Sequence, residues 1–129
     1  MAEKPLISAR NLSVHYPLRG GLFGPKLVVR AVEGVNIDID RGNFFGLVGE
    51  SGSGKTTLGR ALLKAAPITH GQVTYNDGEV EYDLVTLKDK ELKDYRKRAQ
   101  LIFQDPYAAL SPRMTVRDII AEPLEVMGL

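Results

Sequence analysis

One short pattern constrains this chain more than any other feature: Gly-x-x-x-x-Gly-Lys-[Ser/Thr]. The chain satisfies it in full at residues 49–56, which read Gly49-Glu50-Ser51-Gly52-Ser53-Gly54-Lys55-Thr56. Glycines let the backbone curl so that successive N–H groups face phosphate oxygens, and a helix that begins beside them adds its positive end. Lys55 supplies a point charge for the β- and γ-phosphates, and the Thr56 hydroxyl can ligate Mg²⁺. The pattern predicts a loop that binds a nucleoside triphosphate.

The sequence on both sides of this phosphate loop (residues 49–56) agrees with the prediction. Residues 44–48 are almost unbroken in apolar character, which is typical of a strand covered on both faces of a parallel sheet. After the loop, one apolar helix face is predicted by the spacing of Leu58, Ala61, Leu62 and Ala65. We expect this helix to begin near Lys55 and to end at Pro67.

Alternation, turn residues and helical spacing predict the remaining elements. Strands are expected at residues 6–16, 27–29, 35–39 and 99–103, with a hairpin inside residues 71–87. Helices are expected at residues 88–98 and from Thr115 to the last residue. Residues 18–25 are predicted to form a loop, Pro17 to end the first strand, and Pro123 to interrupt the last helix.

Composition excludes several classes of function. With 17 basic and 16 acidic residues, the net charge of +1 gives no argument for nucleic-acid binding, and the mixed charges of residues 88–98 are typical of a solvated helix. The absence of cysteine excludes thiolate metal sites and cysteine nucleophiles. His15 and His70 lack the spacing of a metal site, so a core or surface role is expected. No apolar run approaches the roughly 20 residues of a membrane span, so any link to a membrane is expected through a partner.

Four passages carry a resemblance to a known family: residues 11–17, 31–35, 46–60 and 102–116. The most specific is the last, which contains Gln104-Asp105-Pro106-Tyr107 and ends in Pro112-Arg113-Met114-Thr115-Val116. The chain resembles the first half of the ATP-binding subunit of an ATP-binding cassette (ABC) transporter. The likeness is strongest to the subunits of dipeptide and oligopeptide importers.

This resemblance implies roles for matching residues. Tyr16 would stack on adenine, although a plain strand tyrosine is the alternative. Gln104, as the glutamine of the Q-loop, would contact Mg²⁺ or the attacking water and act in catalysis with Lys55, although a turn or helix-capping role stays open. Thr56 and Gln104 are thus the expected metal ligands. The remaining nucleotide-binding residues are expected to be Gly49, Ser51, Gly52, Ser53, Gly54 and Thr57. Asp105 could pass for the magnesium-associated aspartate, but that aspartate normally ends its strand directly, and here Gln104 separates it from the expected strand. A general-base role for Glu50 is disfavoured.

The implied fold is α/β: the core of a phosphate-loop nucleotide hydrolase with an N-terminal antiparallel β-subdomain. Residues 1–105 would form this part of the core, and residues 106–129 the exit of the Q-loop and the beginning of a helical subdomain, where the chain would be truncated. The family's Leu-Ser-Gly-Gly-Gln signature, its strand ending in Asp-Glu, its D-loop and its switch histidine do not occur in the 129 residues. We therefore expect ATP binding without appreciable turnover, and stabilisation by self-association or nucleotide.

The resemblance also implies a function for the parent protein: ATP binding and hydrolysis, with Mg²⁺, would drive import of peptides or similar solutes. A second ATP-binding subunit and membrane-spanning permease subunits would be its partners, at the cytoplasmic face of the membrane. Two alternatives stay open, namely a nucleotide-binding interaction module without hydrolysis and an unrelated phosphate-loop kinase. Another solute, such as nickel, is also open.

Overall fold

The computed structural model describes residues 3–18, 24 and 27–129 and contains two compact units, Met1–Leu87 and Lys88–Leu129. Most of the loop predicted at residues 18–25 lies outside the described residues. The division expected at residue 105 follows subdomains of a larger fold rather than compactness, and it stays a prediction.

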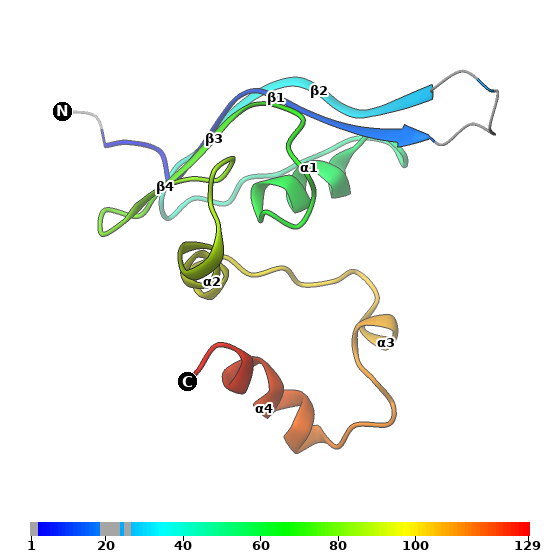
Figure 1. The fold of residues 1–129 in the computed structure, drawn as a ribbon, viewed down its shortest axis with the longest axis vertical. Coiled ribbons are helices and arrows are strands. Elements are labelled where there is room, and N and C mark those ends of the chain that lie inside the picture. The colour runs from blue at the N-terminus through cyan, green and yellow to red at the C-terminus, as the bar shows by residue number, and fades with distance from the viewer. Residues whose placement is uncertain (1–2, 19–23, 25–26) are drawn as a thin grey trace. The chain divides into compact units, whose positions relative to one another are not determined.

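The first unit is built on a four-stranded antiparallel sheet in the order β2-β1-β3-β4 (Figure 1). Its strands are β1 Ile7–Leu18, β2 Leu27–Ile39, β3 His70–Asn76 and β4 Glu81–Asp83. β1 lies at the centre and pairs with β2 on one side and β3 on the other, while β3 and β4 form the predicted hairpin. The expected antiparallel subdomain is confirmed, and β2 runs unbroken through the two strands predicted there.

Helix α1, Lys55–Leu62, packs against this sheet and forms the core with it (Figure 1). Leu58 and Ala61 of α1 are buried, as are Leu12, Val14 and Val73 of the strands. The spacing of apolar residues therefore predicted the buried face correctly as far as Leu62. Burying a leucine or valine side chain contributes about 1.5–3 kcal/mol, so this contact holds the start of α1 at a fixed place beneath the sheet.

Two predicted boundaries of the first unit are wrong. α1 ends at Leu62 rather than at Pro67, because Lys64 turns into the left-handed region with φ 58°, and Ala65 is exposed. Pro17 does not end β1 but lies inside it, opposite Val28. The pairing of β1 with β3 ends at Ser13, so beyond that residue β1 has one neighbour, and a missing N–H is tolerated on the free edge.

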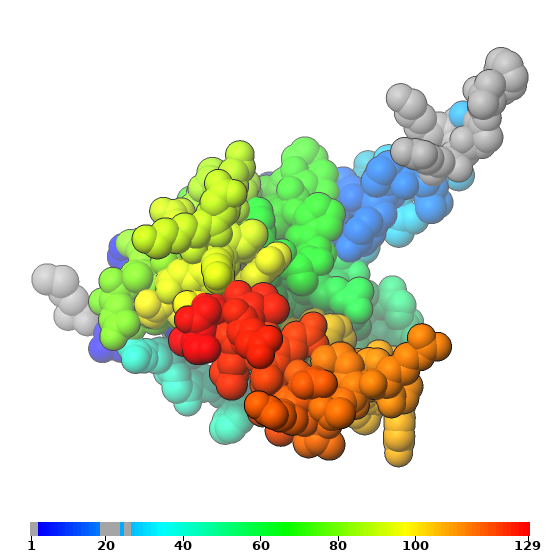
Figure 2. Space-filling model, turned by 60° about the horizontal axis from the view of Figure 1, so that its bottom comes forward, coloured from blue at the N-terminus to red at the C-terminus, as the bar shows by residue number. Residues whose placement is uncertain are grey.

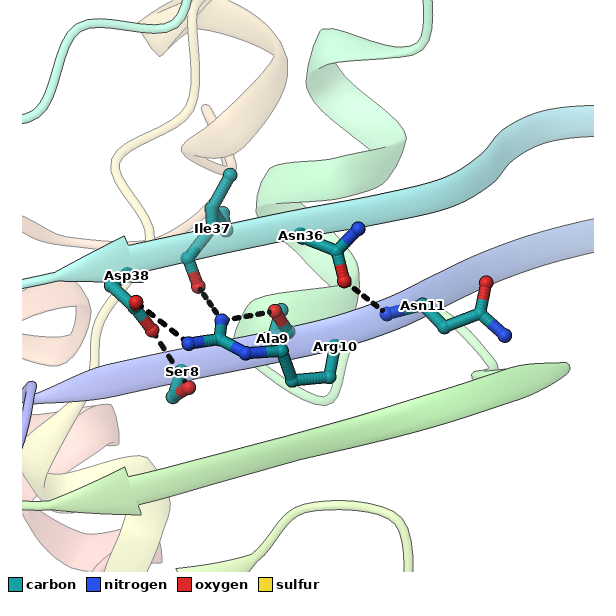
Figure 3. A network of polar contacts seen from close by, with 7 residues as sticks. All are labelled: Ser8, Ala9, Arg10, Asn11, Asn36, Ile37 and Asp38. Carbon is teal, nitrogen blue, oxygen red and sulfur yellow. Dashed lines mark hydrogen bonds and ion pairs between the residues drawn. The ribbon is translucent and has the colours of Figure 1, made fainter.

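A polar network fixes the register of β1 against β2 near one end of the sheet (Figure 3). Nη2 of Arg10 lies 2.7 Å from Oδ2 of Asp38, and the Ser8 hydroxyl donates to Oδ1 of the same carboxylate at 2.8 Å. The Arg10 guanidinium also donates to the carbonyls of Ala9 and Ile37, at 2.8 and 3.3 Å. Hydrogen bonds from Arg10 and then Ser8 lower the pKa of Asp38. The network spans both strands just before the irregular pairing that follows Ala9.

Two predicted strands do not form. Residues 44–48 and 99–103 lack regular secondary structure, and Phe44 and Val48 are almost fully exposed. A strand needs a neighbour for its N–H and C=O groups, and within the described residues no segment pairs with either run. The apolar sequence of residues 44–48 thus predicted burial that this chain does not provide.

The second unit contains three helices: α2 Asp89–Arg98, α3 Pro106–Ala109 and α4 Val116–Val126. α3 was not predicted, although Asp105 caps it by accepting from the N–H of Tyr107 at 2.9 Å, and a proline follows at the first helical position. Thr115 caps α4, accepting from the N–H of Asp118 at 3.2 Å. The prediction that Pro123 interrupts the last helix is wrong, because Pro123 lies inside α4. A proline removes one hydrogen bond, and the following residues still find acceptors. Among the described residues, no helix is both long and apolar enough to cross a membrane.

Candidate phosphate-binding site

The phosphate loop leads directly into α1, as the sequence predicted. Gly54 is the N-cap of α1, with φ 95°, and offers no side chain to the helix. The first intrahelical bond joins the N–H of Leu58 to the carbonyl of Gly54 at 2.8 Å. In the described part of the chain, the N–H groups of Lys55, Thr56 and Thr57 therefore have no acceptor. Free donors at the positive end of a helix make a site for an anion.

Close packing against β2 explains why the pattern requires glycine at position 54. A Cβ built on Gly54 would lie 2.3 Å from the carbonyl oxygen of Ala31 in β2, closer than any non-bonded carbon approaches. The positive φ is itself unfavourable for every other residue type. The close packing of Gly54 against Ala31 thus fixes the position of the end of the loop relative to the sheet.

The Lys55 side chain folds back over the phosphate loop. Its ammonium donates to the carbonyl oxygen of Gly49 and, at 2.9 Å, to that of Glu50. The N–H of Ser53 also donates to the Glu50 carbonyl, at 3.1 Å, which closes a turn inside the loop. The hydroxyl-bearing residue Thr56 is exposed. The loop therefore combines a positioned cation with free N–H donors and a hydroxyl open to solvent.

A cavity of about 480 Å³ lies between this loop and β2. It is bounded by β2, by residues 47–49 and by the start of α1, and its lining includes Arg30, Val32, Gly49, Ser53, Lys55 and Leu58. A volume of this size is typical of a small-molecule site. Lys55 and Arg30 give the lining two positive charges, and Glu33 gives it one negative charge.

Tyr16 lies near the end of β1, opposite Val29 of β2, with 37% of its surface exposed. Figure 2 shows this end of the two strands, in blue and light blue, extending away from the rest of the first unit. Tyr16 does not line the cavity. Its ring is open to solvent on the same unit as the phosphate loop, and its stacking on adenine stays a prediction.

Gln104 belongs to the second unit. The residue is exposed and lies in a bend just before Asp105, the N-cap of α3. The neighbouring Asp105 carboxylate is engaged as the cap of α3. The predicted contact of Gln104 with Mg²⁺ or water therefore stays a prediction.

Sequence reasoning missed a cluster of titratable residues in the first unit. Nε2 of His15 lies 2.5 Å from Oε2 of Glu33, and the rings of His15 and His70 meet edge to face with centroids 5.6 Å apart. The hydrogen bond from His15 is the largest cause that lowers the pKa of Glu33, and the charges of His15, Arg30 and His70 add to it. The strands themselves were predicted, but the pairing and the irregular register that bring these residues together were not. Within the residues described here, no set of three or more His, Cys, Asp or Glu is arranged to hold a metal ion.

Comparison with known proteins gives one family. A family model described as "ABC transporter" matches residues 32–126. The chain is 47% identical over 127 residues to the oligopeptide transport ATP-binding protein OppF of Streptococcus mutans, covering 98% of this chain and 38% of that protein. It is 45% identical to the glutathione import ATP-binding protein GsiA of Escherichia coli, covering 98% of this chain and 20% of GsiA. A Brucella ovis protein named for peptide import and ATP binding is 45% identical over all 129 residues. The chain spans 38% of that relative's length.

Solved structures support the same fold. An ATP-binding cassette in a dimeric, post-hydrolysis state with ADP and phosphate superposes with a TM-score of 0.71 and 27% sequence identity. The match covers 94% of this chain and 47% of the cassette. A second dimeric structure of a bacterial ABC transporter cassette gives a TM-score of 0.70. The expected α/β fold of a cassette ATPase is thereby confirmed.

Proposed function

Because the chain belongs to the ABC transporter family, we propose that it is the ATP-binding part of an importer that takes up peptides or similar solutes. Identity of 45–47% across nearly the whole chain to proteins named for oligopeptide and glutathione import supports this function. The parent protein would couple ATP binding and hydrolysis to import.

The geometry of the phosphate loop carries the proposal. Among the described residues, the N–H groups of Lys55, Thr56 and Thr57 have no acceptor at the start of α1, and the Lys55 ammonium lies over the same loop, so phosphate oxygens can accept from both. The close approach of Gly54 to Ala31 holds the end of the loop and the start of α1 against β2. These residues therefore fit the triphosphate of a nucleotide.

Other residues have roles that follow the family. Gly49, Ser51, Gly52 and Ser53 would wrap the phosphates, and Tyr16 would stack on adenine. Thr56 would hold Mg²⁺ together with Gln104, and Mg²⁺ would offset the negative charge that develops on the phosphates. Lys55 would hold the β- and γ-phosphates during transfer to water.

In the parent protein, two such subunits would enclose ATP between them. A similar cassette has been solved as a dimer with ADP and phosphate, which supports a second ATP-binding subunit as a partner. Permease subunits would bind near the Q-loop and the helices that follow it, at the cytoplasmic face of the membrane. Hydrolysis would reopen the dimer and shift the permease between its inward and outward states. The chain itself is expected to bind ATP without turnover.

ATP binding by the purified 129-residue chain is the first test. Titration calorimetry should show binding that Lys55→Ala weakens by about tenfold or more, because a charge-assisted contact with phosphate is lost. Lys97→Ala in α2 removes the same charge elsewhere and should leave the affinity unchanged. Equal affinity of the unchanged chain and the Lys55→Ala variant would contradict the proposed site.

The proposed contact of the Thr56 hydroxyl with Mg²⁺ can be tested separately. Thr56→Val removes a hydroxyl at similar volume, so it should weaken ATP binding in the presence of Mg²⁺ and have little effect with Mg²⁺ chelated. The same loss under both conditions would show that the hydroxyl contacts phosphate rather than Mg²⁺.

Transport can be tested with a chimera. The 127 aligned residues of OppF from Streptococcus mutans would be replaced by those of this chain. We expect the chimera to support uptake of a labelled oligopeptide, and Lys55→Ala within it to abolish uptake. A chimera that binds ATP and assembles with its permease but does not support uptake would contradict the transport proposal.

A further inference from the structure

We propose that Arg30 is a second phosphate-binding residue of this site, which contacts the α-phosphate of the nucleotide. This inference rests on the proposed ATP binding and adds a residue outside the Gly-x-x-x-x-Gly-Lys-[Ser/Thr] pattern.

The place of Arg30 in the cavity is the first argument. Arg30 lines the same cavity as Gly49, Ser53 and Lys55, although it comes from β2 rather than from the phosphate loop. The neighbouring Ala31 is the residue whose carbonyl packs closely against Gly54. Arg30 thus stands one residue away from the point where β2 contacts the loop.

The second argument is that the Arg30 guanidinium has no committed partner. Among the described residues it forms no hydrogen bond and no ion pair, although a guanidinium carries five N–H donors. The acidic side chain of the cavity lining, Glu33, is held instead by His15 at 2.5 Å. Arg30 contributes to the lowered pKa of Glu33 only through its charge, without a hydrogen bond. A planar donor group beside an anion site suits a phosphate.

The strand register indicates which phosphate of the nucleotide Arg30 contacts. Arg30 lies opposite His15, and the adjacent Val29 lies opposite Tyr16. Arg30 therefore stands between the proposed adenine-stacking residue and the phosphate loop. The phosphate nearest the nucleoside is the α-phosphate, whereas Lys55 serves the β- and γ-phosphates.

The titratable groups that act on Glu33 come from three strands: His15 from β1, Arg30 from β2 and His70 from β3. The described residues place no second carboxylate in the lining of the cavity. With Glu33 bound by His15, the Arg30 side is left open to an added anion.

The test compares ATP and ADP affinities of the 129-residue chain with Arg30→Gln, Arg30→Lys, Lys55→Ala and a control, Arg60→Gln. Arg60 lies in the last turn of α1 and is exposed, so its replacement removes the same charge outside the cavity. Arg30→Gln should weaken ATP and ADP equally, by about tenfold, because both nucleotides carry the α-phosphate. Arg30→Lys should retain most of the affinity, and Arg60→Gln should match the unchanged chain.

Phosphorus NMR of bound ADP gives a second readout. Arg30→Gln should shift the α-phosphate resonance more than the β-phosphate resonance, and circular dichroism should confirm that the variant is folded. Affinities of Arg30→Gln equal to those of Arg60→Gln would overturn the inference while the Lys55→Ala result upheld ATP binding. A loss confined to ATP would also overturn it, because the contact would then be to the γ-phosphate. If the unchanged chain does not bind ATP, the proposed function is wrong, and this inference with it.

Discussion

Oε2 of Glu33 lies 2.5 Å from Nε2 of His15, so one side-chain contact joins β2 to β1 next to the exposed Tyr16. His15 is mostly covered, with 15% of its side chain exposed, whereas 56% of the Glu33 side chain is exposed. The contact therefore lies at the border between the sheet and solvent. It lowers the pKa of Glu33, through the hydrogen bond first and through neighbouring positive charges second.

The lowered pKa predicts how stability depends on pH. A carboxylate whose folded pKa is depressed stabilises the fold above its unfolded pKa, near 4.5, and this contribution is lost as pH falls through the folded value. Glu33→Gln should thus lower the urea midpoint at pH 7, and the difference from the unchanged chain should shrink below about pH 4.5. The matched control is Glu81→Gln, whose pair with Lys4 is longer, at 3.4 Å, and exposed on both sides. A difference that stayed constant on acidification would show that the ion pair is not the cause.

The same contact predicts an effect on nucleotide affinity. His15→Ala should release the Glu33 carboxylate, which can then pair with Arg30 and compete with phosphate. We expect ATP affinity to fall up to about fivefold, the range of an exposed ion pair. Adding Glu33→Gln should restore it, because the competing charge is gone. If the double variant binds as weakly as His15→Ala alone, the imidazole acts through the strand rather than through Glu33.

Exposed apolar residues predict self-association of the 129-residue chain. Phe44 and Val48 are almost fully exposed on a segment whose sequence is typical of a buried strand. Size-exclusion chromatography with light scattering should show species larger than 14.2 kDa that depend on concentration. The double variant Phe44→Ser and Val48→Ser should shift the chain toward the monomer. A monomer across the whole concentration range of the unchanged chain would contradict this prediction.

The parts of the fold that could be predicted are those set by local rules. The phosphate loop, the start of α1 at Lys55 and the hairpin at Asn76-Asp77-Gly78 follow from glycine placement, capping and apolar spacing over a few residues. Alternation predicted strand character in residues 6–16 and 35–39, which lie in β1 and β2. Each of these signals is complete within its own segment.

The parts that could not be predicted depend on residues far away in the chain. Residues 44–48 have the sequence of a strand but find no partner, and Pro17 is tolerated because β1 loses one neighbour beyond Ser13. The His15–Glu33 contact needs the register of two strands, which shifts three times along their length. Arg30 reaches the cavity through that register, so no local pattern marks it as part of the site.

The contact between Gly54 and Ala31 gives the sharpest structural prediction. Gly54→Ala introduces a Cβ only 2.3 Å from the carbonyl oxygen of Ala31, at a φ of 95° that alanine disfavours. We expect it to destabilise the chain by about 1–3 kcal/mol and to abolish ATP binding, because the loop must leave β2.

Gly59→Ala, in the same helix, is the control. A Cβ at Gly59 meets nothing within 4 Å, so this variant should stabilise α1 by about 0.5–1 kcal/mol and leave ATP affinity unchanged. Urea unfolding and calorimetry of both variants separate the two effects. If Gly54→Ala keeps its affinity, the loop does not need its contact with β2 to bind phosphate, and the position of the sheet then has no part in building the site.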